Sequence, residues 1–183
     1  DGDNNLDLYV VSGGSEFNER SPQLADRLYM NDGTGIFAKS GNSEVSNYTI
    51  SGKTIEKIDF DKDGDYDLII GNRIVPQKYP LHEPSIIYQN NNGTLENVTG
   101  RIAPEFEDFG MVNKIVATDF NNDGWEDFIV VGEWTHIGLF QNTNGEFKRT
   151  RKGWAWKGIS TSKSVYYICL FIYLYYFIYF RIE

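Results

Sequence analysis

Two nine-residue segments rich in acidic and amide side chains hold the residues best suited to chemistry. The segments are DFDKDGDYD at residues 59–67 and DFNNDGWED at residues 119–127. Both place side-chain oxygens at positions 1, 3, 5 and 9, with glycine at position 6, where the backbone must turn sharply. Hard oxygen ligands suit Ca²⁺, which accepts about six to eight of them, and neither segment holds the histidine or cysteine that favours zinc. Each segment is therefore a candidate calcium loop.

The candidate ligands follow from these positions in each Asp loop. Asp65 is expected to contribute its main-chain carbonyl at position 7, which Trp125 occupies in the other loop. Asn121 replaces a carboxylate with an amide, so the 119–127 loop offers less charge to a cation. A third copy at the start of the chain lacks position 1 and has Asn4 in place of glycine, so we expect it to bind most weakly. We predict two to three Ca²⁺ sites, with the ligands Asp59, Asp61, Asp63, Asp65 and Asp67; Asp119, Asn121, Asp123, Trp125 and Asp127; and Asp1, Asp3, Asn5 and Asp7.

Two alternative interpretations of the Asp loops are weaker. An EF-hand loop ends in glutamate at position 12 between helices, whereas position 12 here is Ile70 or Val130, inside an apolar run. Asp, Asn and Gly also form turns without an ion, but a turn does not need acid at four fixed positions in repeated copies. We interpret the ion as structural, because the loop joins two expected strands and Cys169, the single cysteine, permits no internal disulfide.

The Asp loops recur with a period of 60 residues, which defines the elements that must position them. The equivalent acidic residues at position 9 of the three copies are Asp7, Asp67 and Asp127. Apolar runs flank each complete loop, and another apolar run leads into an Asn/Gly turn at residues 31–33, 90–93 and 142–145, which is typical of a hairpin. About four strands per repeat form a propeller blade, and closed propellers have about four to eight blades. The sequence therefore predicts an all-β partial β-propeller of about three four-stranded blades in residues 1–150.

Residues 1–150 also resemble a known family, the FG-GAP/VCBS repeat proteins, whose integrin-α-like blades carry calcium in β-hairpin loops. The segments DLYVVSGG at 7–14, DRLY at 26–29, GNRIVP at 71–76 and VGEW at 131–134 are similar to the cartilage acidic protein and ASPIC/UnbV branch. The resemblance implies a secreted or cell-surface binding or adhesion module with a protein or glycan ligand. It implies no catalytic residues.

The charge of the chain is divided between two parts. Residues 1–147 hold 25 of the 26 acidic and 10 of the 17 basic side chains, a net charge of −15. A body this acidic repels phosphate backbones, so we expect no nucleic-acid partner. Divalent cations and basic surfaces are the partners that the charge favours.

A glycan-active hydrolase or lyase is the alternative function from another class. Its candidate carboxylates are Glu105, Glu107, Asp108 and Glu133. Paired carboxylates cleave glycosidic bonds, but a solvated acidic surface is the favoured interpretation of these four. No serine or cysteine lies in a recognisable nucleophile elbow, so we expect no enzyme.

A ligand surface is a further expectation, drawn from aromatic and basic residues outside the Asp loops. Arg73, Tyr79 and Trp134 are its candidates. Aromatic residues beside strands more often pack against the sheet, and packing is the favoured interpretation of these rings.

The end of the chain departs from the repeat pattern. Residues 151–164 form a basic linker, and residues 165–180 are sixteen uncharged residues that include six tyrosines. This run is slightly shorter than the roughly 17 to 25 residues of a membrane helix, and tyrosine prefers the membrane interface. We favour a disrupted or out-of-frame end, with a single-span membrane anchor as the alternative, and expect membrane contact only in the second case.

Overall fold

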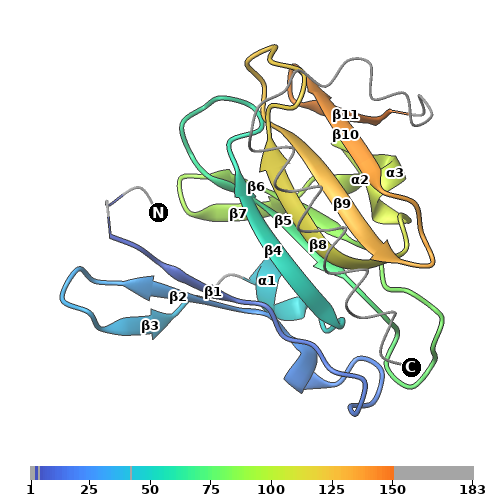
Figure 1. Ribbon diagram of the computed structural model, residues 1–183. Helices are drawn as coiled ribbons and strands as arrows, with labels where there is room; N and C mark the ends of the chain where they lie inside the picture. Colours follow the sequence, from blue (N-terminus) through green and yellow to red (C-terminus); the bar gives the residue numbers. More distant parts are fainter. Residues whose placement is uncertain (1–2, 4, 42, 151–183) are drawn as a thin grey trace, which may run out of the picture.

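The computed structural model describes residues 3, 5–41 and 43–150, whose strands form three antiparallel sheets (Figure 1). The first sheet contains β1 (Leu8–Val10), β2 (Arg27–Asn31) and β3 (Phe37–Lys39). The second contains β4 (Gly52–Ile58), β5 (Asp67–Asn72), β6 (Ile86–Asn91) and β7 (Thr94–Asn97). The third contains β8 (Met111–Thr118), β9 (Asp127–Glu133), β10 (Gly138–Thr143) and β11 (Glu146–Arg149). Within each sheet, every strand pairs with the next along the chain, as in a propeller blade, which confirms the predicted all-β partial propeller.

The first sheet has one strand fewer than the other two. In the second and third sheets, β4 and β8 lead into the complete Asp loops. Among the described residues, no strand precedes the Asp loop of the first sheet as β4 and β8 do in the other two. Four strands per blade therefore describe the second and third sheets, and three describe the first.

Short helices occupy several connections between the strands. They are η1 (Pro22–Leu24), α1 (Ser43–Asn47), α2 (Thr99–Ile102) and α3 (Pro104–Glu107). Each has three to five residues, too few for a hydrophobic period of about 3.6 residues to show in the sequence. That is why the sequence predicted strands alone.

Membrane insertion is tested only in the described part of the chain. None of the helices there has the length and apolar character required to cross a bilayer. The basic linker at residues 151–164 and the apolar run at residues 165–180 lie outside the described residues.

The second sheet is buried on both faces, because neighbouring sheets cover each side. Successive side chains of a strand point to opposite faces. On β5, Ile69 packs in a core cluster with residues of the third sheet, and Ile70 packs in a second cluster with residues of the first sheet. In the third sheet, Phe128 and Phe140 stack with ring centroids 4.6 Å apart. Burial on both faces explains why these strands are continuous apolar runs.

The topology separates two faces of the molecule. One face, called here the Asp-loop face, contains residues 3–7, 59–67 and 119–127, which precede β1 or connect β4 to β5 and β8 to β9. The other, called the long-loop face, contains the connections at the opposite ends of β1, β5 and β9, at residues 11–26, 73–85 and 134–137. The candidate calcium ligands and the candidate ligand surface therefore lie at opposite ends of the strands.

Candidate metal centre

The aspartate at position 9 fastens each complete Asp loop to the sheet. Asp67 is fully buried. Its Oδ2 accepts a hydrogen bond from the Phe60 N–H at 3.1 Å, and its Oδ1 accepts one from the Asn90 N–H at 2.8 Å. Asp127 makes the same two bonds, at 3.1 and 2.7 Å, with the equivalent residues of the third sheet. The start of the loop and the neighbouring strand are thus held by one carboxylate.

Burial changes the protonation of both anchoring carboxylates. It raises the pKa of Asp67 to about 7 and that of Asp127 to about 6, although the backbone hydrogen bonds lower both values. Nearby Asp61 and Asp63 raise the pKa of Asp67 further, since like charges disfavour the ionised form. A bound cation would favour the ionised form of both groups.

An asparagine completes the same network in all three repeats. The Asn90 side-chain amide donates to the Tyr66 carbonyl at 3.1 Å, and its Oδ1 accepts from the Gly93 N–H at 2.9 Å. Asn31 and Asn142 repeat all of these bonds. The sequence identified these asparagines only as turn formers, and the recurrence of Asn before Gly in each hairpin was the signal for their further role.

Three carboxylates converge in the 59–67 loop. One oxygen each from Asp59, Asp61 and Asp67 lies within 4.8 Å of the others. Asp59 Oδ1 is buried and has no hydrogen-bond partner among the described residues. Each pair of charges at this spacing repels by about 1 kcal/mol even at the dielectric constant of water. A buried, unpartnered oxygen beside two other carboxylates fits a hard cation such as Ca²⁺.

Contacts from outside the 59–67 loop hold two of these residues. Gln89, on β6, donates from Nε2 to Asp61 Oδ2 at 2.6 Å. Glu126, from the neighbouring 119–127 loop, accepts a bond from the Asp59 N–H at 3.1 Å. The orientation of the cluster therefore depends on the packing of the third sheet beside the second.

Two other predicted ligands of this loop lie outside the three-carboxylate group. Asp63 Oδ1 accepts from the Asp65 N–H at 2.8 Å. Asp65 Oδ2 accepts from the Asn92 N–H at 2.8 Å. Between them, Gly64 has a φ of +96°, a left-handed conformation that favours glycine. Both side chains thus stabilise the turn in this structure, and the roles of the Asp63 carboxylate and the Asp65 main-chain carbonyl as ligands stay predictions.

The 119–127 loop arranges the same types of ligand differently. Asp119 accepts from the Asp123 N–H at 3.2 Å through Oδ1 and from the Gly124 N–H at 2.8 Å through Oδ2. The Asn121 amide donates to Asp123 Oδ2 at 2.8 Å. Trp125 turns its ring toward the other loop, where Lys62 Nζ lies 3.9 Å from the ring centroid. Hydrogen bonds within the loop therefore occupy oxygens that a cation would otherwise use.

A family model for the FG-GAP-like repeat matches residues 1–70 and, a second time, residues 59–130. The chain belongs to the FG-GAP-like repeat family. The two matches overlap at residues 59–70, which contain the complete 59–67 loop, so the Asp loops are part of the family's repeat unit. No curated protein matches the sequence significantly, and the closer resemblance to the ASPIC/UnbV branch stays a prediction.

Membership of the FG-GAP-like family indicates a general type of function. Such repeats are typically non-enzymatic scaffolds, and they suggest an adhesion-like or binding β-propeller module. Repeats of this kind often bind Ca²⁺. The acidic group of Asp59, Asp61 and Asp67 can hold such an ion.

The incomplete Asp loop of this FG-GAP-like chain is only partly described. Asp3 accepts two bonds from Asn5, one from its backbone N–H and one from its side-chain amide, each at 2.8 Å. These bonds lower the pKa of the exposed Asp3 carboxyl. Asp7 accepts from the Asn31 N–H at 2.9 Å, as its equivalents do in the other repeats. Asp1 lies outside the described residues.

Two of the four candidate carboxylates of the alternative hydrolase, Asp108 and Glu133, each have a basic side chain as partner. Asp108 Oδ1 lies 2.6 Å from His82 Nε2, and Glu133 forms an ion pair with Arg73 at 2.7 Å. Glu105 and Glu107 are in the first turn of α3. Asp108 and Glu133 thus have basic side chains as neighbours rather than each other, unlike the paired carboxylates of glycosidases.

Proposed function

We propose that this FG-GAP-like chain is a non-catalytic, calcium-stabilised binding module of a secreted or cell-surface protein. The convergence of Asp59, Asp61 and Asp67, with one buried oxygen of Asp59 lacking a partner, supports the calcium part of the proposal. Extracellular modules bind Ca²⁺ with dissociation constants of about 10⁻⁴ to 10⁻³ M. A secreted location exposes the module to calcium at such levels.

The three converging carboxylates would hold the ion, and Asp67 would transmit its effect to the sheet. Asp67 also anchors the loop to Phe60 and Asn90, so an ion on this carboxylate stabilises the connection between β4, β5 and β6. Calcium supplies charge compensation there. The 119–127 loop is a second, weaker site in this proposal, because a cation must compete with the hydrogen bonds of Asp119.

A protein or glycan ligand is the proposed partner of the module. The non-catalytic part of the proposal is supported by the partners of Asp108 and Glu133, whose neighbours are His82 and Arg73. Incubation with oligosaccharides tests it, because a hydrolase or lyase releases new chain ends. The appearance of such ends, abolished by Glu133→Gln, would overturn the non-catalytic assignment.

Thermal unfolding in calcium and in EDTA tests the metal. One site at 100 times its dissociation constant stabilises the folded state by about 2.7 kcal/mol. At about 2 to 4 °C per kcal/mol for a chain of this size, we expect the Tm to rise by roughly 5 to 10 °C. Asp59→Asn should remove most of this rise, while Asp32→Asn, an exposed aspartate outside the Asp loops, should leave it intact. A Tm that is equal in EDTA and in calcium at about 100 times such a dissociation constant would sink the proposal.

A further inference from the structure

Two aromatic rings are exposed on the long-loop face. The side chains of Trp134 and Tyr79 are 83% and 55% exposed. The Trp134 Nε1–H donates a hydrogen bond to the Tyr79 hydroxyl, which joins the end of β9 to the β5–β6 connection. Packing against a sheet would bury these rings, so that interpretation of the sequence is wrong for both. We call Trp134 and Tyr79 the aromatic platform.

An ion pair joins the same two segments as the aromatic platform. Arg73 donates from Nε to Glu133 Oε1 at 2.8 Å, and its Nη2 lies 2.7 Å from the same oxygen. Glu133 immediately precedes Trp134 in the chain. The two segments that carry the platform therefore also carry a guanidinium and a carboxylate held by each other, both able to bond hydroxyl groups.

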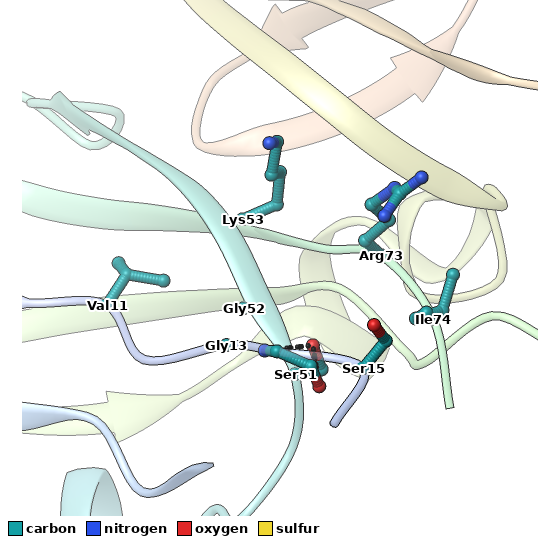
Figure 2. Close-up of a pocket in the computed structure, with 9 residues that line it drawn as sticks. Val11, Gly13, Ser15, Ser51, Gly52, Lys53, Arg73 and Ile74 are labelled. Carbon is teal, nitrogen blue, oxygen red and sulfur yellow. Dashed lines mark hydrogen bonds between the residues drawn. The ribbon is translucent and has the colours of Figure 1, made fainter. Parts of the chain in front are cut away.

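A pocket of about 240 Å³ adjoins this ion pair between the first and second sheets. Its lining includes Lys53, Arg73, Ser15 and Ser51 (Figure 2), with glycine backbone along one side. Figure 2 shows the Lys53 side chain, on β4, and the Arg73 side chain, just after β5, extending in the same direction. An added Cβ on Gly13 would lie 2.0 Å from the carbonyl oxygen of the facing β4 residue, so the two backbones meet closely there. Lys53 and Arg73 are the charged residues of the described lining, with Glu133 paired to Arg73 and the Glu16 carboxylate beside Gly14.

The candidate calcium ligands are too distant to cancel the charge of Lys53. The candidate calcium ligands lie on the Asp-loop face, at the other end of β4. Seven strand residues span about 20 Å, whereas salt screens charges beyond about 8 Å at physiological ionic strength. Arg73 is already paired with Glu133, so among the described residues Lys53 is the lining cation that a ligand carboxylate can pair with.

We propose that the long-loop face binds an acidic oligosaccharide, with a sugar ring on the aromatic platform and a uronate carboxylate in the pocket. A pyranose ring presents a flat face of C–H groups that matches an exposed aromatic ring, and its hydroxyls match the polar groups of Arg73 and Glu133. Lys53 supplies the cation for the carboxylate. This inference rests on the proposed function as a binding module, whose ligand class it names.

Calorimetric titration of the full chain with hexagalacturonate, in saturating calcium, tests the inference. The matched ligand is the fully methyl-esterified hexamer, which keeps the ring faces and loses the charges. We expect Lys53→Met to weaken binding of the acidic hexamer about tenfold, and Trp134→Ala to weaken it tenfold or more. Lys57→Met, on the same strand, and Phe37→Ala, an exposed ring on β3, are matched controls that should bind normally.

Several outcomes would overturn the inference. The first is that the acidic hexamer does not bind, or that the esterified hexamer binds equally well. The second is that inorganic sulfate or hexaglutamate binds with the same affinity as the acidic hexamer. The third is that neither Lys53→Met nor Trp134→Ala changes the binding. Melting of the same samples in calcium and in EDTA separates the two proposals. If the Tm depends on calcium but the hexamer does not bind, this inference alone is overturned. If the Tm does not depend on calcium, the metal site is overturned, and hexamer binding still decides this inference.

Discussion

The 59–67 and 119–127 loops share one spacing and one fold, yet they differ in how their charges are compensated. In the 59–67 loop, three carboxylates converge and a buried oxygen of Asp59 lacks a partner. In the 119–127 loop, backbone N–H groups of the loop itself satisfy both oxygens of Asp119. A ligand motif therefore specifies which oxygens are present, and the local hydrogen bonds decide how available they are to an ion.

The residue at position 3 is one further difference between the two loops. Asn121 brings its own donor and bonds Asp123 at 2.8 Å. Asp61 has no donor to offer when ionised, and it receives one from Gln89 on the neighbouring strand. One amide in place of one carboxylate thus lets a loop compensate its charge internally.

Removal of the anchoring carboxylates should have the largest effect on the free energy of unfolding. Asp67→Ala and Asp127→Ala each leave two buried backbone N–H groups without an acceptor, at about 1 to 3 kcal/mol per group. In EDTA we expect both variants to lose roughly 3 kcal/mol or more of unfolding free energy, measured by denaturant titration. In calcium, Asp67→Ala should lose more than Asp127→Ala. Losses below about 1 kcal/mol in EDTA would show that the anchors contribute little.

The pH dependence of metal-free stability should be the next largest effect. Asp67 and Asp127 have folded-state pKa values of about 7 and about 6, above the ordinary value of 3.8. The folded state then binds more protons than the unfolded state, so stability is greatest below about pH 4 and falls as pH rises through 6 and 7. We expect the Tm in EDTA to fall between pH 5 and pH 8, and calcium to flatten the profile. A Tm that rises over this interval contradicts the assignment.

Exchange of the position-3 residues should make the calcium response of each loop more like that of the other. The expected change in stability is smaller than in the two predictions above. Asp61→Asn removes one charge from the convergent cluster, so we expect it to stabilise the calcium-free protein by about 1 kcal/mol and to reduce the calcium-induced rise in Tm. Asn121→Asp should do the opposite in the other loop. Calorimetric calcium titrations of both variants measure the change in affinity. If neither variant alters the calcium response, position 3 does not distinguish the loops.

The contact between Lys62 and Trp125, which joins the two loops, should have the smallest effect on the free energy of unfolding. Lys62 Nζ lies 3.9 Å from the Trp125 ring centroid, and an exposed cation–π contact contributes about 0.5 to 1 kcal/mol. A double-mutant cycle of Lys62→Met and Trp125→Leu in calcium should give a coupling of about 0.5 kcal/mol. Zero coupling would mean that the loops are stabilised independently.

Spacing along the chain was enough to predict the strands and the loops. A period of two in side-chain direction, apolar runs and Asn/Gly turns are local properties, so β4, β5, β8 and β9 were predicted on either side of their Asp loops. The 60-residue recurrence then implied blade-like sheets, which the FG-GAP-like matches and the three sheets confirm. The short helices were missed, because four or five residues show no helical period.

The arrangement of the side chains was decided by contacts between strands and between sheets. Asp59 and Asp61 are held by Glu126 and Gln89, which are 67 and 28 residues away in the chain, and Asp63 lies outside their group although its spacing is equivalent. The exposure of Trp134 likewise depends on what packs over the end of β9. Sequence spacing constrains only neighbours along one strand or turn, whereas convergence and burial arise when separate strands pack together, and that packing decides which of the predicted oxygens can meet around one ion.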